Sequence, residues 1–293
     1  MKKRIAILGC ENSHANAFIE YIKRTPKYSE NIEIIGVYSN EASASLNLNE
    51  KFGVPILSHY ADAFGEIDGL IITARHGALH YEYAKPYINS GIPMFIDKPI
   101  TVDEEEAVAF MRELRSAGVR VSGGSSLKHD KQVCTLRRDR EEQKDGKTLG
   151  GIVRAPLDTC SVYGGFYFYA QHLVEIVLEI FGRYPNSVFA KKNGEETTVI
   201  FSYDEYDVTG FFFEHNYVYY ACRFSEKSTD GGELVSTEEC NWFEKEFDEY
   251  YDLLMDGDQK TSYSDFISPV FVMNAIERSF KSGDVEKINR YEI

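Results

Sequence analysis

The chain has 293 residues, a formal net charge of −15 at neutral pH and 43% hydrophobic residues. This length exceeds what a single hydrophobic core usually organises, so we expect two domains. The strong negative charge argues against a protein that grips nucleic acid or an anionic membrane with a broad basic face. We therefore expect a small-molecule partner, with no nucleic acid and no membrane.

The cysteine pattern fits a reducing compartment, and the first residues do not form a signal peptide. The five cysteines are scattered, with neither a Cys-x-x-Cys pair nor a zinc-type spacing with histidine. Residues 1–4 are basic, but the apolar run after them is too short for a signal peptide. No stretch approaches the roughly 20 apolar residues of a membrane span. We expect a cytoplasmic protein.

The first 125 residues alternate short apolar runs with amphipathic segments, a pattern that predicts βαβ units around a parallel sheet. The predicted strands cover residues 4–8, 32–38, 69–73, 93–96 and 119–122, and the predicted helices cover residues 13–24, 41–52, 79–89 and 103–117. Residues 1–125 should therefore form a doubly wound Rossmann domain of the dinucleotide-binding type. Its ligands are expected at the carboxyl ends of the strands.

The second half of the chain has a different pattern, and we expect residues 126–293 to form an α+β substrate and oligomerisation domain. Aromatic and β-branched residues alternate over residues 197–202 and 208–224, which is typical of a largely antiparallel sheet. The other predictions are a connecting helix and loop over 126–149, helices over 167–181, 244–255 and 264–282, and a solvated acidic face over 230–246. The closing helices can pack back on the first domain. Aromatic sheet faces predict a homo-oligomer.

The turn after the first strand is the first candidate site. In a dinucleotide fold this turn presents backbone N–H groups and the positive end of a helix to a pyrophosphate. Of the usual G-x-G-x-x-G pattern only Gly9 is present, because Glu11 and His14 stand at the second and third glycine positions. The turn can bind a pyrophosphate, it can merely cap the helix through residues 11–13, or Glu11 and His14 can line a polar site of different chemistry.

The end of the second strand bears on the choice of cofactor. An acid at this place holds the 2′-hydroxyl of the adenosine ribose and favours NAD. Here the strand ends in Tyr38, Ser39 and Asn40, and no lysine or arginine follows at once. The choice between NAD and NADP therefore stays open.

Three further segments resemble the glucose-fructose oxidoreductase and inositol dehydrogenase (Gfo/Idh/MocA) family. An acid-apolar strand over 68–73 ends in Thr73-Ala74, where the family has Thr-Pro, and His80 follows near a helix start. Asp97-Lys98-Pro99 then stands where the family has Glu-Lys-Pro. The resemblance continues through residues 149–182 and 247–279, so that it covers nearly the whole chain.

This resemblance implies hydride transfer between NAD or NADP and a hydroxyl-bearing carbon of a sugar, a polyol or a related compound. It assigns the catalytic roles to Lys98, which would hold the substrate oxygen, and His172, which would exchange the proton. The family has an aspartate one helical turn before this histidine, where this chain has Phe168. The implied cofactor residues are Gly9, Glu11, Asn12, Ser13, His14, Ser39, Thr73, His76, His80 and Asp97, and the implied substrate residues are Lys98, Tyr163, Tyr169 and His172.

The altered positions leave other functions open. His76 and His80 lie four residues apart, but no third ligand is identifiable, and we expect no metal site. Because Glu11, His14 and Phe168 depart together from the family pattern, a non-catalytic ligand-binding or regulatory protein on the same scaffold is the alternative. A lyase or hydrolase that retains its cofactor is a third hypothesis.

Overall fold

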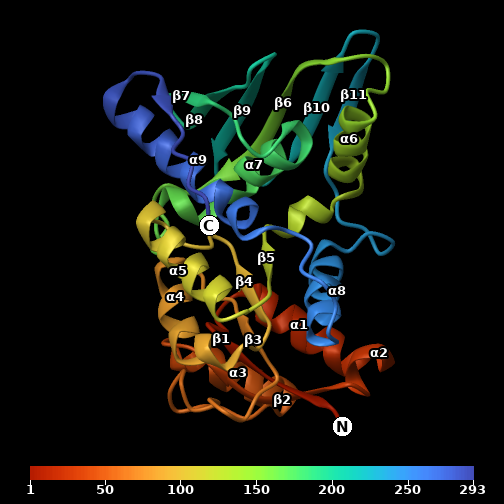
Figure 1. The fold of residues 1–293 in the computed structure, drawn as a ribbon, viewed down its shortest axis with the longest axis vertical. Coiled ribbons are helices and arrows are strands. Elements are labelled where there is room, and N and C mark those ends of the chain that lie inside the picture. The colour runs from red at the N-terminus through yellow and green to blue at the C-terminus, as the bar shows by residue number, and fades with distance from the viewer.

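The computed structural model describes residues 1–293 and arranges the strands in two sheets, one above the other in Figure 1. The first sheet is entirely parallel, with the strand order β2-β1-β3-β4-β5. Its strands are β1 (Lys3–Leu8), β2 (Ile32–Tyr38), β3 (Gly69–Ile72), β4 (Met94–Asp97) and β5 (Val121–Gly124). This is the doubly wound sheet that the apolar runs predict.

The helices of the first half also lie near their predicted positions. They are α1 (Ser13–Arg24), α2 (Pro26–Ser29), α3 (Ala42–Phe52), α4 (Ala78–Ala84), η1 (Lys85–Ser90) and α5 (Glu104–Ser116). The single helix predicted over 79–89 is wrong in detail, since α4 gives way to the 3-10 helix η1 at Lys85. Pro86 accounts for the change, because proline lacks the N–H that an α-helical hydrogen bond needs.

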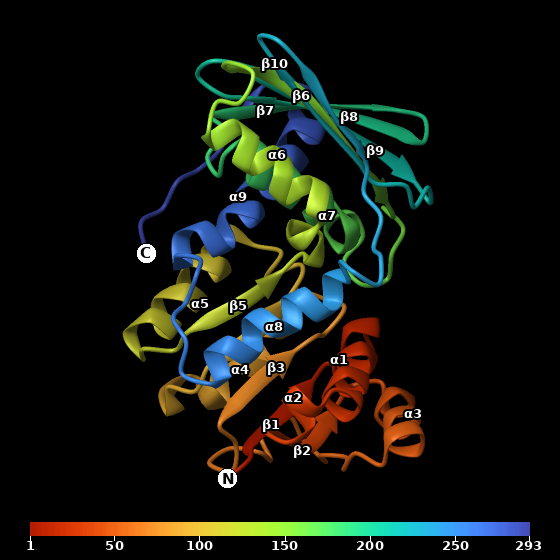
Figure 2. The same cartoon turned by 90° about the vertical axis from the view of Figure 1, so that its right-hand side faces the viewer.

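The two faces of the first sheet are covered by different elements. Successive side chains of a strand point to opposite faces, so Ile5 and Ile7 of β1 pack in one cluster and Ala6 and Leu8 in another. The first cluster contains residues of α1 and also of α8 (Trp242–Leu254), a helix from the far end of the chain. Figure 2 shows α8 lying across this sheet beside α1. The C-terminal segment thus completes the cover of the N-terminal sheet.

The second sheet has the order β11-β10-β6-β9-β8-β7-β12, and only β6 and β9 pair in parallel. Its strands are β6 (Thr148–Leu157), β7 (Ser187–Asn193), β8 (Glu196–Ser202), β9 (Asp207–Glu214), β10 (Tyr220–Ser225), β11 (Thr229–Glu233) and β12 (Glu286–Lys287). The helices packed on it are α6 (Lys131–Glu141), α7 (Phe166–Phe181) and α9 (Tyr263–Ser282), and η2 (Ser126–His129) links the two sheets. The sheet is therefore largely antiparallel, as the alternation predicts.

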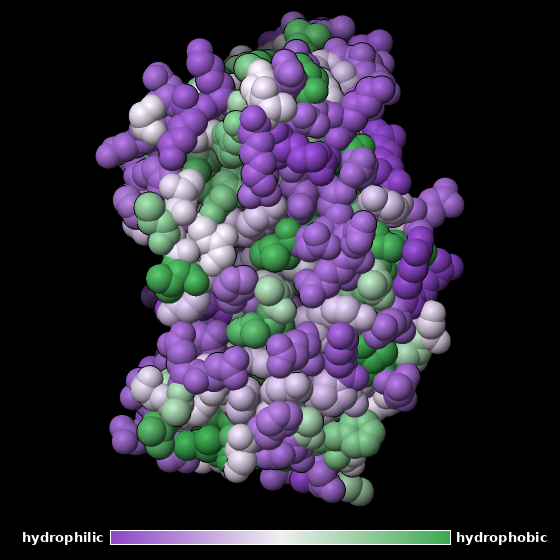
Figure 3. Space-filling view, turned by 90° about the vertical axis from the view of Figure 1, so that its left-hand side faces the viewer, coloured by the Kyte–Doolittle hydropathy of each residue, from purple (hydrophilic) through white to green (hydrophobic).

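The molecular surface and the helices can be described by their hydropathy. On the face seen in Figure 3, apolar residues form small separate groups among hydrophilic ones. None of the helices has both the length and the apolar composition that crossing a bilayer demands.

Candidate active site

A cavity of about 240 Å³ lies between the carboxyl ends of the first sheet and the start of α7. It is lined by six residues that the sequence singles out: Asn12, Ser13, His14, Lys98, Tyr169 and His172. These residues come from the first turn, the end of β4 and α7, so the fold brings together segments up to 160 residues apart. In an open α/β sheet this is the expected place for a ligand.

Lys98 directly follows β4 and is almost fully buried. Its Nζ donates to the backbone oxygen of Phe168 at 3.3 Å, and it lies 4.6 Å from the centre of the Phe168 ring and 5.5 Å from that of Tyr169. Burial lowers the pKa of Lys98, although the charges of Asp97 and Glu246 oppose this effect. Lys98 can therefore present to a ligand in the cavity an ammonium group whose proton is lost more readily than that of an exposed lysine.

His172 lies on α7 and is also nearly buried. Its Nδ1 is 2.7 Å from the hydroxyl of Ser125, whereas its Nε2 has no partner within the chain. Burial, and then the charge of Lys98, hold the pKa of His172 well below its usual value. The imidazole is therefore neutral at neutral pH, and Ser125 fixes the orientation of its ring.

The first turn has the shape of an anion receptor. Gly9 has a φ of +73°, and a Cβ built on it would lie 2.3 Å from the backbone nitrogen of Ala74, so only glycine fits here. Thr73 Oγ1 donates to the Gly9 oxygen at 3.0 Å and ties the turn to β3. The N–H groups of residues 11–13 donate no hydrogen bond within the chain. They stand at the positive end of α1, where an anion is stabilised.

The side chain of Glu11 leaves this receptor free. Its carboxylate accepts one hydrogen bond from Ser39 Oγ at 2.6 Å and another from the Arg75 N–H at 2.9 Å. Glu11 is therefore held between the ends of β2 and β3, and its backbone N–H stays available.

His14 joins two buried carboxyl groups. Its Nδ1 lies 2.5 Å from Asp97, which also accepts from Asn12 Nδ2 at 2.9 Å, and its Nε2 lies 3.7 Å from Glu246. Glu246 is fully buried, and neither of its oxygens has a hydrogen-bond partner. Burial, and then the charge of Asp97, raise the pKa of Glu246 well above its usual value. Asp97 thus positions the first turn from inside the protein.

The prediction of a solvated face over 230–246 is wrong at its end. Glu246 is fully buried, and Trp242 and Phe243 line the cavity. The reason is that α8 turns one face to the first sheet, and the helical period places these residues on that side. The Trp242-Phe243 pair at the start of an amphipathic helix is the signal that could have found them.

The remaining predicted residues lie outside the cavity. His80 is fully buried, and its nitrogens lie 2.8 Å and 3.2 Å from the backbone oxygens of Ala74 and Ile100. It joins the segments after β3 and β4 and does not line the cavity, so a cofactor role for His80 stays a prediction. Thr73 is likewise fully buried and serves the turn.

His76 and Tyr163 lie beside Arg75, which lines the cavity. His76 Nδ1 accepts from the N–H of Ala78 at 3.2 Å and so caps α4. The Tyr163 hydroxyl accepts from Arg75 at 3.0 Å and donates to Glu41 at 3.1 Å, which joins the two halves of the chain. A ligand role for His76 and Tyr163 stays a prediction.

The cavity also has walls that the sequence does not single out as site residues. Besides Trp242 and Phe243 these are Ser126, Leu127 and Tyr219. Arg75, one of the polar residues that follow β3, and Phe168, which stands where the family has an aspartate, line the cavity as well. Ser126 and Leu127 belong to η2, and no sequence pattern marks them, because their role depends on how the two sheets meet.

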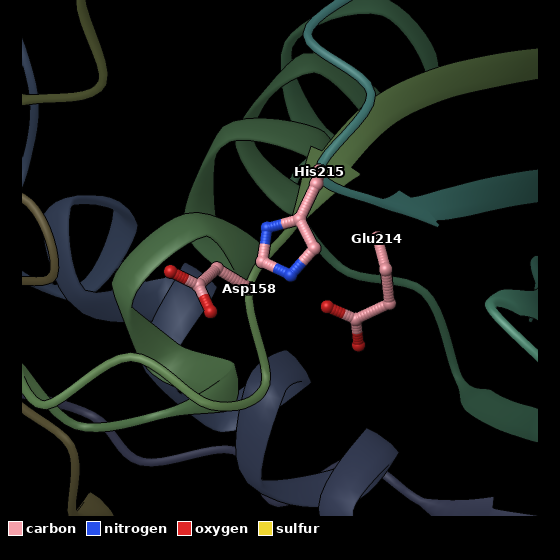
Figure 4. A group of neighbouring side chains, drawn as sticks. All are labelled: Asp158, Glu214 and His215. Atoms are coloured by element: carbon pink, nitrogen blue, oxygen red, sulfur yellow. The ribbon is translucent and has the colours of Figure 1, made fainter.

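Two other groups of polar residues lie outside this cavity. Figure 4 shows Asp158, Glu214 and His215 grouped where β6 and β9 end, and ligand-type atoms of the three residues lie within 4.8 Å of one another. Both Glu214 oxygens accept hydrogen bonds from Thr159, so this group holds the loop after β6. A larger hollow of about 830 Å³ lies between α6, α7 and α8. Its charges are largely paired, as for Arg137 with Glu179.

Comparisons with known proteins agree with this architecture. Residues 3–125 match the profile of the Gfo/Idh/MocA family, described as an oxidoreductase family with an NAD-binding Rossmann fold. The chain is similar to Oxidoreductase P35 of Formosa agariphila, with 21% identity over 213 residues. That match covers 64% of this chain and 63% of the relative, which is less than two thirds of its length.

Solved structures resemble the chain over its whole length. A myo-inositol dehydrogenase from Corynebacterium glutamicum has a TM-score of 0.82 at 15% identity, covering 99% of this chain and 100% of the other. GenD2 from gentamicin A biosynthesis, solved in complex with NAD, has a TM-score of 0.84 at 13% identity, covering 98% and 97%. At this level of identity the likeness concerns the fold. Residues 3–125 therefore resemble the NAD-binding Rossmann domain of the Gfo/Idh/MocA oxidoreductase family, and the whole chain has the fold of the dehydrogenases to which it is similar.

Proposed function

We propose that this chain is an NAD-dependent oxidoreductase that acts on a hydroxyl group of a sugar, a polyol or a related compound. The observation that carries this proposal is the placement of Lys98 and His172 in one cavity beside an anion-binding helix end. The family of the Rossmann domain and the fold of the similar dehydrogenases support the same function.

The residues of the first turn fit a dinucleotide. The unpaired N–H groups of residues 11–13 and the positive end of α1 supply what a pyrophosphate needs. Glu11 points away from these groups because Ser39 and Arg75 hold its carboxylate. Bound there, the nicotinamide nucleotide would supply the hydride acceptor or donor.

The side chains of the cavity supply the acid-base chemistry. Lys98 can donate a hydrogen bond to the substrate oxygen and stabilise negative charge that develops on it. The neutral His172 can accept the hydroxyl proton at Nε2 in the tautomer whose Nδ1–H donates to Ser125 Oγ. The cavity of about 240 Å³ is smaller than the roughly 300–1,000 Å³ of drug-sized ligand sites, which favours a small hydroxylated substrate.

The test has a binding arm and a turnover arm. We expect the purified chain to bind NAD(H) in a calorimetric titration and to exchange hydride with at least one member of a sugar and polyol panel. Lys98→Ala should lower turnover by about 10²–10⁴-fold, the range for a lost acid-base group. Lys131→Ala, which removes an exposed lysine of α6, is the matched control and should retain full turnover. A flat titration with both NAD(H) and NADP(H) at millimolar concentration would exclude this function.

A non-catalytic ligand-binding protein is the second candidate. It is favoured by Phe168, which stands where the family has an aspartate and whose ring and carbonyl group contact Lys98. This candidate predicts nucleotide binding without hydride exchange. Turnover that Lys98→Ala abolishes while the fold stays intact would rule it out.

A further inference from the structure

The end of β2 lacks the acidic residue that usually accepts a hydrogen bond from the adenosine ribose of NAD. Ser39 follows the strand directly, and its hydroxyl accepts a hydrogen bond from the N–H of Glu41 at 3.0 Å. A serine can contact a ribose hydroxyl, but it carries no charge that would oppose the 2′-phosphate of NADP. The selectivity for one cofactor must then come from another residue near this strand end.

The carboxylate of Glu11 lies at this position. It comes from the turn after β1, and each of its oxygens accepts one hydrogen bond, from Ser39 Oγ and from the Arg75 N–H. A carboxylate oxygen can accept a second hydrogen bond. Glu11 is therefore held in place and still has an acceptor site on each oxygen for a ribose hydroxyl.

The surrounding charges disfavour a phosphate at the end of β2. Glu41 adds a second carboxylate two residues beyond Ser39, and neither Glu11 nor Glu41 forms an ion pair. The nearby guanidinium of Arg75 donates to the Tyr163 hydroxyl at 3.0 Å and lies 4.9 Å from the centre of its ring. A 2′-phosphate beside Ser39 would thus lie close to the Glu11 carboxylate, which no ion pair neutralises.

We propose that Glu11 recognises the adenosine ribose in place of the missing acid of β2 and makes this chain selective for NAD over NADP. The inference rests on the proposed function, since its ligand is the nicotinamide dinucleotide. In this chain the carboxylate that would contact the ribose comes from the turn after β1 and not from the end of β2, and Ser39 positions it.

The test compares three ligands by calorimetry: NAD⁺, NADP⁺ and the NAD⁺ analogue that lacks the adenosine 2′-hydroxyl. The wild type should bind NAD⁺ at least about tenfold more tightly than either of the others, as expected for a lost charge-assisted hydrogen bond or an added repulsion. In Glu11→Gln, NAD⁺ should bind about tenfold more weakly, and both differences should shrink. Glu33→Gln removes an exposed carboxylate at the other end of β2 and should leave all three affinities unchanged.

Each result decides the matter in one direction. Equal affinity of the wild type for NAD⁺ and NADP⁺, or undiminished binding of the deoxy analogue, overturns the role of Glu11 and leaves the proposed function standing. Binding of none of the three ligands overturns both proposals. If Glu11→Gln fails to fold, the comparison of the three ligands on the wild type can still overturn the proposal, because it requires no variant.

Discussion

The ammonium nitrogen of Lys98 lies 3.3 Å from the backbone oxygen of Phe168 and 4.6 Å from the centre of its aromatic ring. An aromatic ring attracts a cation only weakly compared with a carboxylate. The burial that lowers the pKa of Lys98 is therefore only partly compensated at this position.

Phe168→Asp should raise the pKa of Lys98. A carboxylate close to a buried ammonium group favours its charged form. Titration of isotope-labelled lysine by NMR would show the midpoint moving to higher pH, and the same shift should appear in the pH profile of kcat/KM. Phe168→Asn is the control, because asparagine has the size of aspartate but carries no charge. Equal shifts in both variants would show that hydration, rather than charge, is the cause.

Ser125→Ala should lower kcat/KM by roughly five- to tenfold, because it removes the hydrogen bond that orients His172, worth about 1 kcal/mol. KM should change little, since Ser125 does not line the cavity. Ser122→Ala is the control, because the Ser122 hydroxyl is buried without a partner and its loss breaks no hydrogen bond. A similar loss of turnover in both variants would contradict the positioning role of Ser125.

Glu246→Gln should stabilise the fold increasingly as the pH rises. The pKa of Glu246 is raised above its ordinary value of 4.5, so its contribution to stability is present below that pH and is lost as the pH rises through the folded-state pKa. Glutamine does not titrate. When urea unfolding is measured over the range from about pH 5 to about pH 8, the stability advantage of the variant over the wild type should increase with pH.

The exposed Glu239 offers a control for the same measurement. Glu239→Gln removes an equal charge without changing a buried group, so its stability difference from the wild type should stay flat over this pH range. A flat difference for Glu246→Gln as well would mean that His14 and Lys128 keep Glu246 ionised.

His80→Ala should destabilise the fold by about 2–4 kcal/mol, because it leaves a cavity and removes the imidazole N–H that donates to a buried carbonyl group. His76→Ala removes only a half-buried cap and should cost about 0.5–1 kcal/mol. Denaturant unfolding measures both. The folded His80→Ala protein should bind NAD⁺ with nearly unchanged affinity. A large loss of affinity would show that His80 contributes to cofactor binding.

Much of the fold follows from local patterns. The apolar runs at β1, β3 and β4 and the amphipathic stretch of α1 predict their elements closely, because burial on both sheet faces and the helical period leave direct marks in a sequence. The position of Lys98 at a strand end follows from the same marks, since parallel strands place their carboxyl ends at one edge.

Apolar runs and helical periodicity do not predict the environment of each site residue. His80 and His76 look alike in sequence, yet His80 joins two backbone segments in the core, whereas His76 is half-buried and caps α4. Glu246 belongs to an acid-rich stretch, but the packing of α8 on the first sheet removes it from water. Charge composition records which groups are present, and it does not record their neighbours.

Glu11 illustrates the division best. The sequence by itself determined a Rossmann fold, an altered first turn and a strand end without its acid, because each of these is a feature of a short contiguous segment. That the carboxylate of Glu11 reaches Ser39 and the N–H of Arg75 depends on the tertiary structure, which brings the ends of three strands together across 64 residues of chain. The contact is non-local, so it becomes visible only once the chain is folded.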